Sequence, residues 1–201
     1  MPGFFLFQTK RMTTCRRNAF RSAGFTLVEL VVILVVIGIL AAIAIPRFAS
    51  VSSFNIREYG DQALALVRFG QKIAVAQNLP VYVRLNGSSV ALCFDAACTS
   101  PVAAPNNANS GSSATLSACS NSKSWDCEGV PSGVTIAAAD GNGNSYVGSN
   151  ALFYFSGQGK PYKTGESEPI STISKPITVT ISGSAGNNGF AVEPETGYVH
   201  R

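Results

Sequence analysis

The chain has 201 residues, enough for one domain of ordinary size once terminal segments are set aside. Its formal net charge is +4, from 15 basic and 11 acidic residues, but the first 24 residues hold five of the basic side chains and no acidic one. The remainder therefore has ten basic and 11 acidic residues. Such a balance gives no excess of positive charge to attract a polyanion, so composition does not favour a nucleic-acid-binding protein.

A long apolar run follows the basic segment at residues 1–24. From Phe25 to Ile45 there are 21 consecutive residues in which Glu29 is the only charge. A helix rises about 1.5 Å per residue, so this run would span roughly 30 Å, the thickness of a bilayer's hydrocarbon core. The sequence predicts a membrane helix over 25–45, with its amino end held in the cytoplasm by the basic flank. A carboxylate within that helix is costly and indicates a function for Glu29.

The motif GFTLVE at residues 24–29, between a basic leader and an apolar helix, resembles the processing site of type IV prepilins and type II secretion pseudopilins. The resemblance implies that prepilin peptidase removes residues 1–24 by cutting after Gly24 and then methylates Phe25, which becomes N-methylphenylalanine. It also implies that Glu29 neutralises the terminal amine of a neighbouring subunit during assembly, and that the helix bends at Pro46. A secretory signal has a shorter apolar segment, and an ordinary signal anchor does not account for Glu29.

Residues 46–79 are predicted to continue the helix as an amphipathic segment. Apolar residues recur there at steps of three and four, with charged residues between them, so one face is expected to pack on a sheet. Asn78 and Pro80 end the pattern. A helix from Phe25 to Asn78 would be on the order of 80 Å long. The apolar positions are Phe48, Val51, Ile56, Tyr59, Ala63, Leu66, Val67, Gly70, Ile73 and Ala74.

Residues 80–201 have an apolar period of two and are predicted to form a β-rich domain. Val81–Leu85 and Val90–Phe94 flank Asn86-Gly87 and indicate a β-hairpin. A stretch rich in Ala, Ser, Asn and Pro, Thr99–Lys123, is expected to be an exposed loop within a variable region, 99–149. Further strands are predicted at Val134–Ala138, Ala151–Phe155, Pro176–Ser182, Phe190–Val192 and Tyr198–Val199.

Five cysteines are present, of which Cys15 lies in the leader. An even number in an exported domain predicts two disulfides among the other four, with three possible connectivities. The spacing favours nearest neighbours, Cys93 with Cys98 and Cys119 with Cys127, because each pair closes a short loop. A structural zinc site is the alternative, but the spacings lack a CxxC pair and no histidine lies nearby.

The last third of the sequence indicates which pilin-like proteins the chain resembles. The segments FYFSGQGKP (153–161), ITVTIS (177–182) and TGYVHR (196–201) look like those of H-type (GspH) pseudopilins and FimT-type minor pilins. The overall layout resembles minor pilins of the mannose-sensitive haemagglutinin pilus system. The resemblance implies an α+β, type IV pilin-like fold, in which a long amino-terminal helix packs on an antiparallel β-sheet domain outside the inner membrane.

The implied function is a minor structural subunit of a type IV pilus. Its implied partners are prepilin peptidase, the inner-membrane assembly platform, other pilins or pseudopilins, and membrane lipid before assembly. Two alternatives remain: an H-type pseudopilin of a type II secretion system, and a FimT-like pilin for DNA uptake. DNA binding is disfavoured because four basic and four acidic residues cancel within 150–201.

No catalytic residue, cofactor or metal ligand is predicted. His200, the only histidine, is the penultimate residue, where fraying is expected, and no G-x-S-x-G elbow is present. Trp125 lies close to two cysteines in the sequence. It is expected to pack over a disulfide, with a contact to a partner or a sugar as the second interpretation.

Overall fold

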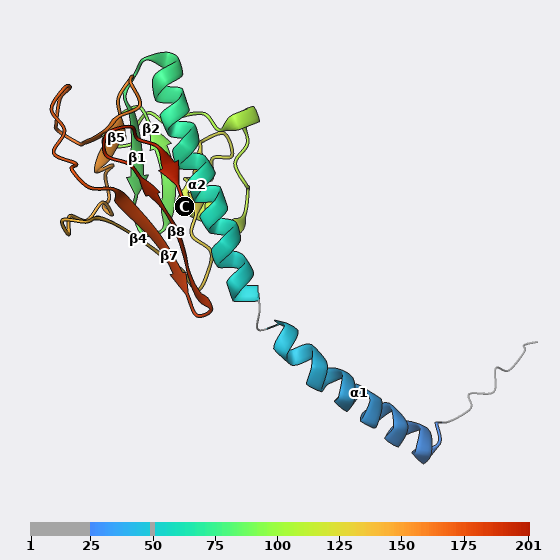
Figure 1. Ribbon diagram of the computed structural model, residues 1–201. Helices are drawn as coiled ribbons and strands as arrows, with labels where there is room; N and C mark the ends of the chain where they lie inside the picture. Colours follow the sequence, from blue (N-terminus) through green and yellow to red (C-terminus); the bar gives the residue numbers. More distant parts are fainter. Residues whose placement is uncertain (1–24, 49–50) are drawn as a thin grey trace, which may run out of the picture. The chain divides into compact units, whose positions relative to one another are not determined.

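The structure is a computed structural model that describes residues 25–48 and 51–201, except for the side chains of 43–52. The leader, with Gly24 and Cys15, lies outside the described residues. The chain divides into two compact units, residues 1–44 and 45–201. The first holds most of helix α1 (Leu27–Phe48), and the second holds the remaining elements (Figure 1).

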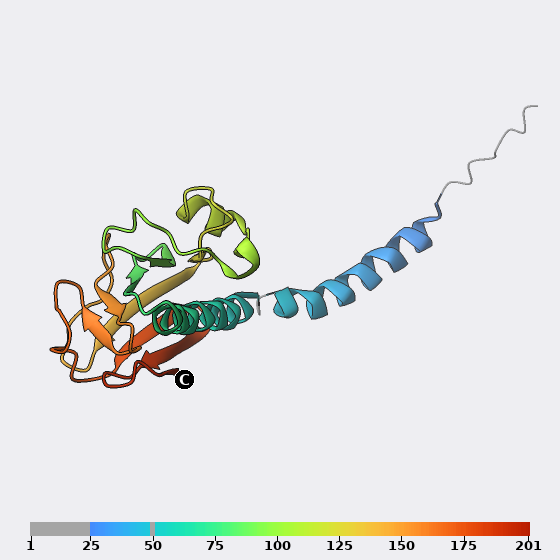
Figure 2. The same cartoon turned by 90° about the horizontal axis from the view of Figure 1, so that it is seen from above.

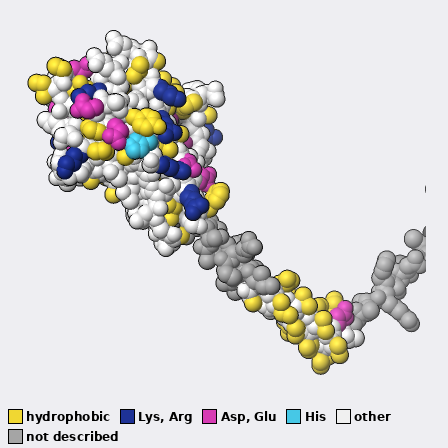
Figure 3. Space-filling model, in the orientation of Figure 1, with side chains coloured by type: hydrophobic (Ala, Val, Ile, Leu, Met, Phe, Trp, Pro, Cys, Tyr) yellow, Lys and Arg dark blue, Asp and Glu magenta, His cyan; other side chains and the backbone are white. Residues whose placement is uncertain are grey.

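Helix α1 begins directly after Thr26, whose Oγ1 accepts a hydrogen bond from the backbone N–H of Glu29 at 3.2 Å. This is an N-cap, which satisfies one of the amide groups that a helix leaves unpaired at its start. Every large apolar side chain from Leu27 to Leu40 is exposed, and hydrophobic side chains cover most of the part of this helix that is coloured in Figure 3. Judged on the described residues, none of the helices combines the length and the hydropathy of a bilayer-crossing segment. The membrane span over 25–45 stays a prediction.

Helix α2 (Val51–Gln77) has the buried face that the sequence predicts. It ends where expected, because Asn78 adopts a left-handed conformation (φ 51°) and Pro80 follows. Helices α1 and α2 together cover nearly the whole predicted range from Phe25 to Asn78. Residues 49–50 lie outside the described residues, so one continuous helix stays a prediction, as does the bend at Pro46. Ile73 of the predicted face is only partly buried. The buried positions are Ile56, Tyr59, Gly60, Ala63, Leu64, Leu66, Val67, Gly70 and Ala74.

The strands form two antiparallel sheets, and Figures 1 and 2 show α2 running alongside both. One sheet has the order β3-β2-β1-β5-β6, and the other has the order β4-β7-β8-β9. The bounds are β1 Val81–Leu85, β2 Ser89–Cys93, β3 Cys127–Gly129, β4 Val134–Asp140, β5 Phe153–Phe155, β6 Pro161–Lys163, β7 Ile177–Gly183, β8 Gly186–Val192 and β9 Val199–His200.

The larger of the two hydrophobic clusters in the described residues is formed by α2 and the two sheets. Alternate residues of β1 and β7 are buried, as the period of two predicts, and the whole of β5 is buried. Phe153 and Phe155 are fully buried and meet edge to face, with ring centroids 5.8 Å apart. This core determines how α2 is held against the strands.

The predicted hairpin is confirmed, with Leu85 paired to Val90. Its turn is centred on Gly87, which has a φ of 80°, and on Ser88, one residue later than an Asn-Gly centre. The reason is the Asn86 side chain, whose Oδ1 accepts hydrogen bonds from the backbone N–H groups of Ser88 (3.1 Å) and Ser89 (2.8 Å). Asn86 therefore stabilises the turn from the position just before its two central residues.

The expectation of a loop throughout Thr99–Lys123 is wrong. The structure has a 3-10 turn at Pro105–Asn107 and a short helix, α3 (Ser113–Ala118), in which Ser112 Oγ accepts from Thr115 N at 3.1 Å. Local composition indicates a loop, but this segment is anchored from far along the chain. Glu128, in the unpredicted strand β3, accepts hydrogen bonds from Ser110 N (2.8 Å) and Thr115 Oγ1 (2.8 Å).

Candidate functional site

The amino-terminal site combines Phe25, Thr26 and Glu29. The Phe25 side chain is 74% exposed, and the exposed Glu29 lies in the first turn of α1. A carboxylate there is stabilised by the helix dipole. Within the described residues, it forms no ion pair. The cap at Thr26 could be recognised from the spacing T-x-x-E, which is the sequence pattern of a capping box. The resemblance to prepilins does not by itself indicate this cap.

Both disulfides are present, in the nearest-neighbour pairing: Cys93–Cys98 and Cys119–Cys127. Trp125 packs in a small buried cluster with these cysteines, as expected, and its Nε1 donates to the Leu92 carbonyl at 2.8 Å. The first disulfide joins the loop after β2 to the end of that strand, and the second joins the end of α3 to the start of β3.

Arg84 is a neighbour of this cluster that the sequence does not single out. Its guanidinium carbon lies 4.9 Å from the centroid of the Trp125 ring, an arrangement that permits a cation–π interaction. Its Nε is buried without a hydrogen-bond partner among the described residues, and burial lowers the pKa of the guanidinium. Because Trp125 is itself buried, the pair belongs to the packing around the disulfides.

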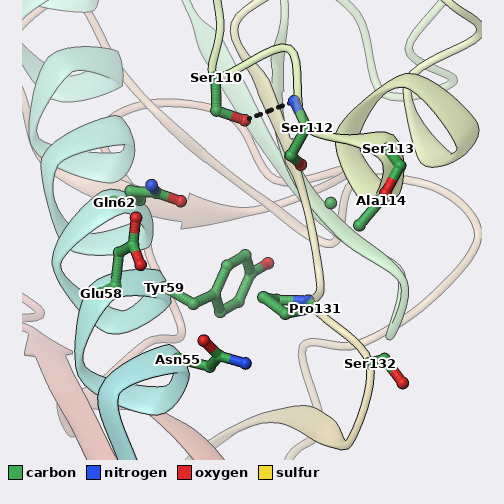
Figure 4. Close-up of a pocket in the computed structure, with 11 residues that line it drawn as sticks. Asn55, Glu58, Tyr59, Gln62, Ser110, Ser112, Ser113, Ala114, Pro131 and Ser132 are labelled. Atoms are coloured by element: carbon green, nitrogen blue, oxygen red, sulfur yellow. Dashed lines mark hydrogen bonds between the residues drawn. The ribbon is translucent and has the colours of Figure 1, made fainter. Parts of the chain in front are cut away.

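A groove runs along one side of α2, where the helix faces the segment from Pro105 to Ser132. It consists of two adjoining pockets of about 360 and 410 Å³ that share Gln62 and Ser110. We call the two pockets together the α2 groove. Figure 4 shows Tyr59 extending from α2 toward Pro131, with Glu58 and Gln62 beside it on the same helix.

Asp126 lines the α2 groove and is unusual because it is only 7% exposed and its Oδ2 has no hydrogen-bond partner among the described residues. Burial, and secondly the negative charge of Glu128, raise the pKa of Asp126 to about 7. Glu128, by contrast, accepts hydrogen bonds from Ser110 and Thr115. Sequence reasoning misses Asp126, because only the packing of α2 and the 105–110 segment removes it from water.

Replacing Asp126 by asparagine is expected to stabilise the fold at alkaline pH. Because the folded-state pKa of Asp126 lies above the unfolded value, the contribution of Asp126 to stability should fall as pH rises from about 4 to about 7. The amide does not titrate, so the variant should gain on the order of 2 kcal/mol at pH 8, and the gain should vanish near pH 4. Thermal unfolding of the purified full-length chain in detergent, compared at pH 4 and pH 8, measures this. An equal difference at both pH values would contradict it.

The carboxyl terminus is tied to α2, contrary to the expected fraying. Arg68 Nε donates to the Val199 carbonyl at 2.8 Å, and Arg201 forms an ion pair with Asp61. His200 Nε2 lies 2.8 Å from Glu193 Oε1, and hydrogen bonding to that carboxylate raises the pKa of the imidazole. These contacts give His200 a structural role at the end of β9.

Comparisons with known proteins find a match in the amino-terminal region of the chain. The family model described as the prokaryotic N-terminal methylation motif matches residues 20–45. PilA5 of Thermus thermophilus, a type IV narrow pilus major component, is 44% identical over 57 residues. The match covers 28% of this chain, which spans about half (49%) of the length of that curated relative. No solved structure matches the chain. Over residues 20–45 the chain therefore carries the prokaryotic N-terminal methylation motif, and in sequence it is similar to a type IV pilin.

Proposed function

We propose that this chain is a minor structural subunit of a type IV pilus. In this proposal, prepilin peptidase cuts after Gly24 and methylates Phe25. Residues 25–45 then span the inner membrane, and the β-rich domain lies on its periplasmic side until the assembly platform moves the subunit into the filament. The methylation motif over residues 20–45 is the observation that carries the proposal.

The apolar surface of α1 supports this proposal, because it indicates that lipid or other subunits cover the helix when the protein functions. Its exposed apolar side chains run without interruption from Leu30 to Ile37 and resume at Ile39, on all sides of the helix. Contiguous apolar surface of this kind marks a site of contact with membrane or protein. Lipid would cover it before assembly and the helices of other subunits afterwards. The two environments are similarly apolar, so the transfer is nearly neutral in hydrophobic terms.

Glu29 supplies the specific part of the assembly step in this proposal. Once Phe25 becomes the amino terminus, a positive charge lies near the start of α1 in every processed subunit. A neighbour's Glu29, placed by the Thr26 cap in the first turn of its helix, is then an ionic partner for that amine. In an apolar environment an unpaired charge is strongly disfavoured, so the pair would select correct axial register.

The processing step is tested by mass spectrometry of the chain extracted from membranes of the producing cell. We expect a mature protein that begins with N-methylphenylalanine at position 25 and lacks residues 1–24. A Gly24→Asp variant should retain the leader, because the resemblance assigns the cut to that glycine. An intact leader on the wild-type chain would refute the proposal at its first step.

A pilus subunit is favoured over a secretion pseudopilin by the relative PilA5, whose name describes a pilus component. The two are separated by a deletion strain. We expect the chain to co-purify with surface pili sheared from the parent cells, and the deletion to leave protein secretion intact. Loss of secreted enzymes with normal pili would instead assign the chain to a type II secretion system.

A further inference from the structure

The α2 groove is lined by acidic side chains without basic partners. Its carboxylates are Glu58 on α2, Asp126 beside β3 and Glu128 in β3. The described residues that line the two pockets include no lysine, arginine or histidine. Nor does any of the three carboxylates take part in an ion pair of the described chain. The negative charge of the groove is therefore not neutralised from within the subunit.

Asp126 differs from the other two carboxylates because it is buried and lacks a hydrogen bond to one of its oxygens in the described structure. Its side chain is more than nine-tenths buried, lines the groove, and leaves Oδ2 without a hydrogen-bond partner in the described structure. Leaving a buried polar group unpaired costs stability, and a buried charge costs more. A cation placed against this carboxylate would offset that cost. Asp126 is therefore the residue with which we expect a cationic ligand to form an ion pair.

The shape of the groove specifies what kind of cation fits. The larger pocket is lined by Ala65, Leu66 and Phe69 of α2 and by Pro105 and Ala108, together with the two carboxylates of Asp126 and Glu128. Apolar and acidic side chains therefore line the same pocket. Lysine and arginine have this composition: an apolar stem of three or four methylene groups that ends in a charged head. A small hydrated metal ion would make no use of the apolar walls.

We propose that the α2 groove receives a lysine or arginine side chain of the neighbouring subunit in the filament. The proposal rests on the function proposed above, because it requires a filament. Such a contact joins unlike surfaces of successive subunits, and heterologous contacts of this type generate open helical assemblies. The donor in this proposal is a second copy of this chain, because Arg57 and Lys72 are exposed on its own α2.

The contact is tested in filaments sheared from cells that make the full-length chain. A photo-crosslinking amino acid replaces Ala65 in the groove or, as a matched control, the exposed Ala137 on β4. We expect the probe at position 65 to join a neighbouring subunit at a peptide whose lysine or arginine lies beside the crosslink. Crosslinks to peptides without a basic residue, or equal crosslinking from both positions, would overturn the proposal.

Asp126→Asn provides the second arm, with the exposed Glu168→Gln as the control for loss of one negative charge. Recovery of the Asp126→Asn chain in filaments should fall roughly tenfold, whereas the control should match the wild type. A thermal unfolding scan shows that the variant is folded, since it is expected to be more stable at pH 8. Equal recovery of both variants would refute the contact. Release of the wild-type chain by EDTA but not by raised salt would assign the groove to a metal ion instead.

The two proposals fail in different ways. Wild-type chain that never enters filaments would refute the pilus function, and this contact with it. If the wild-type chain enters filaments and the Asp126→Asn variant is incorporated equally well, only the contact is refuted.

Discussion

Replacing Glu29 by alanine is expected to leave the chain cleaved, methylated and stably held in the membrane, yet nearly absent from sheared filaments. The reason is electrostatic. In the filament core the neighbour's terminal amine would lose its counter-charge, and removing one partner of a buried ion pair costs roughly 3–5 kcal/mol. That cost corresponds to a loss of more than about a hundredfold in incorporation. Immunoblots of membrane and sheared fractions measure the two pools.

Two control variants separate this effect from a general one. Glu168→Ala makes the same change at an exposed position of the β-rich domain and should leave incorporation unaffected. Thr26→Ala removes only the N-cap, at a cost of about 1 kcal/mol to the helix, and keeps the carboxylate. It should reduce incorporation far less than Glu29→Ala. Recovery of Glu29→Ala in filaments at the wild-type level would rule out the role assigned to this carboxylate.

Truncating Phe155 to alanine is expected to have the largest effect on the fold. Phe155 is fully buried between α2 and the five-stranded sheet, and its ring packs on Phe153. Removing a buried phenylalanine ring costs about 3–5 kcal/mol, because burial is lost and a cavity remains. This is a large fraction of the stability of an ordinary domain. The apparent melting temperature of the full-length chain in detergent should fall accordingly.

Phe54→Ala is the matched control, since it removes the same ring from a side chain that is 67% exposed. Surface substitutions of this kind change stability by about 0.5 kcal/mol or less, so its melting temperature should stay close to the wild-type value. A similar loss from both variants would mean that Phe54 is covered in the isolated chain, in conflict with the exposure of α2 at that point.

The elements of the fold that depend on local pattern could be predicted from the sequence. The buried face of α2, the hairpin β1–β2 and strands β4, β5, β7, β8 and β9 follow from periodicity and turn residues. The amino-terminal site is equally local, because the GFTLVE motif and the apolar run that follows it are contiguous in the chain. Each of these features depends on residues within a few positions of one another, which a sequence displays directly.

What tertiary structure alone decides is the assembly of distant segments. The strands divide into two sheets, α3 forms within an expected loop, and β3 joins the edge of β2 through pairings that no local pattern indicates. Asp126 illustrates the physical reason. In the sequence it is an acidic residue beside a cysteine, and its raised pKa arises only because α2 and the 105–110 segment exclude water from it. Desolvation is a property of the packed chain, so the α2 groove could be recognised only in the folded protein.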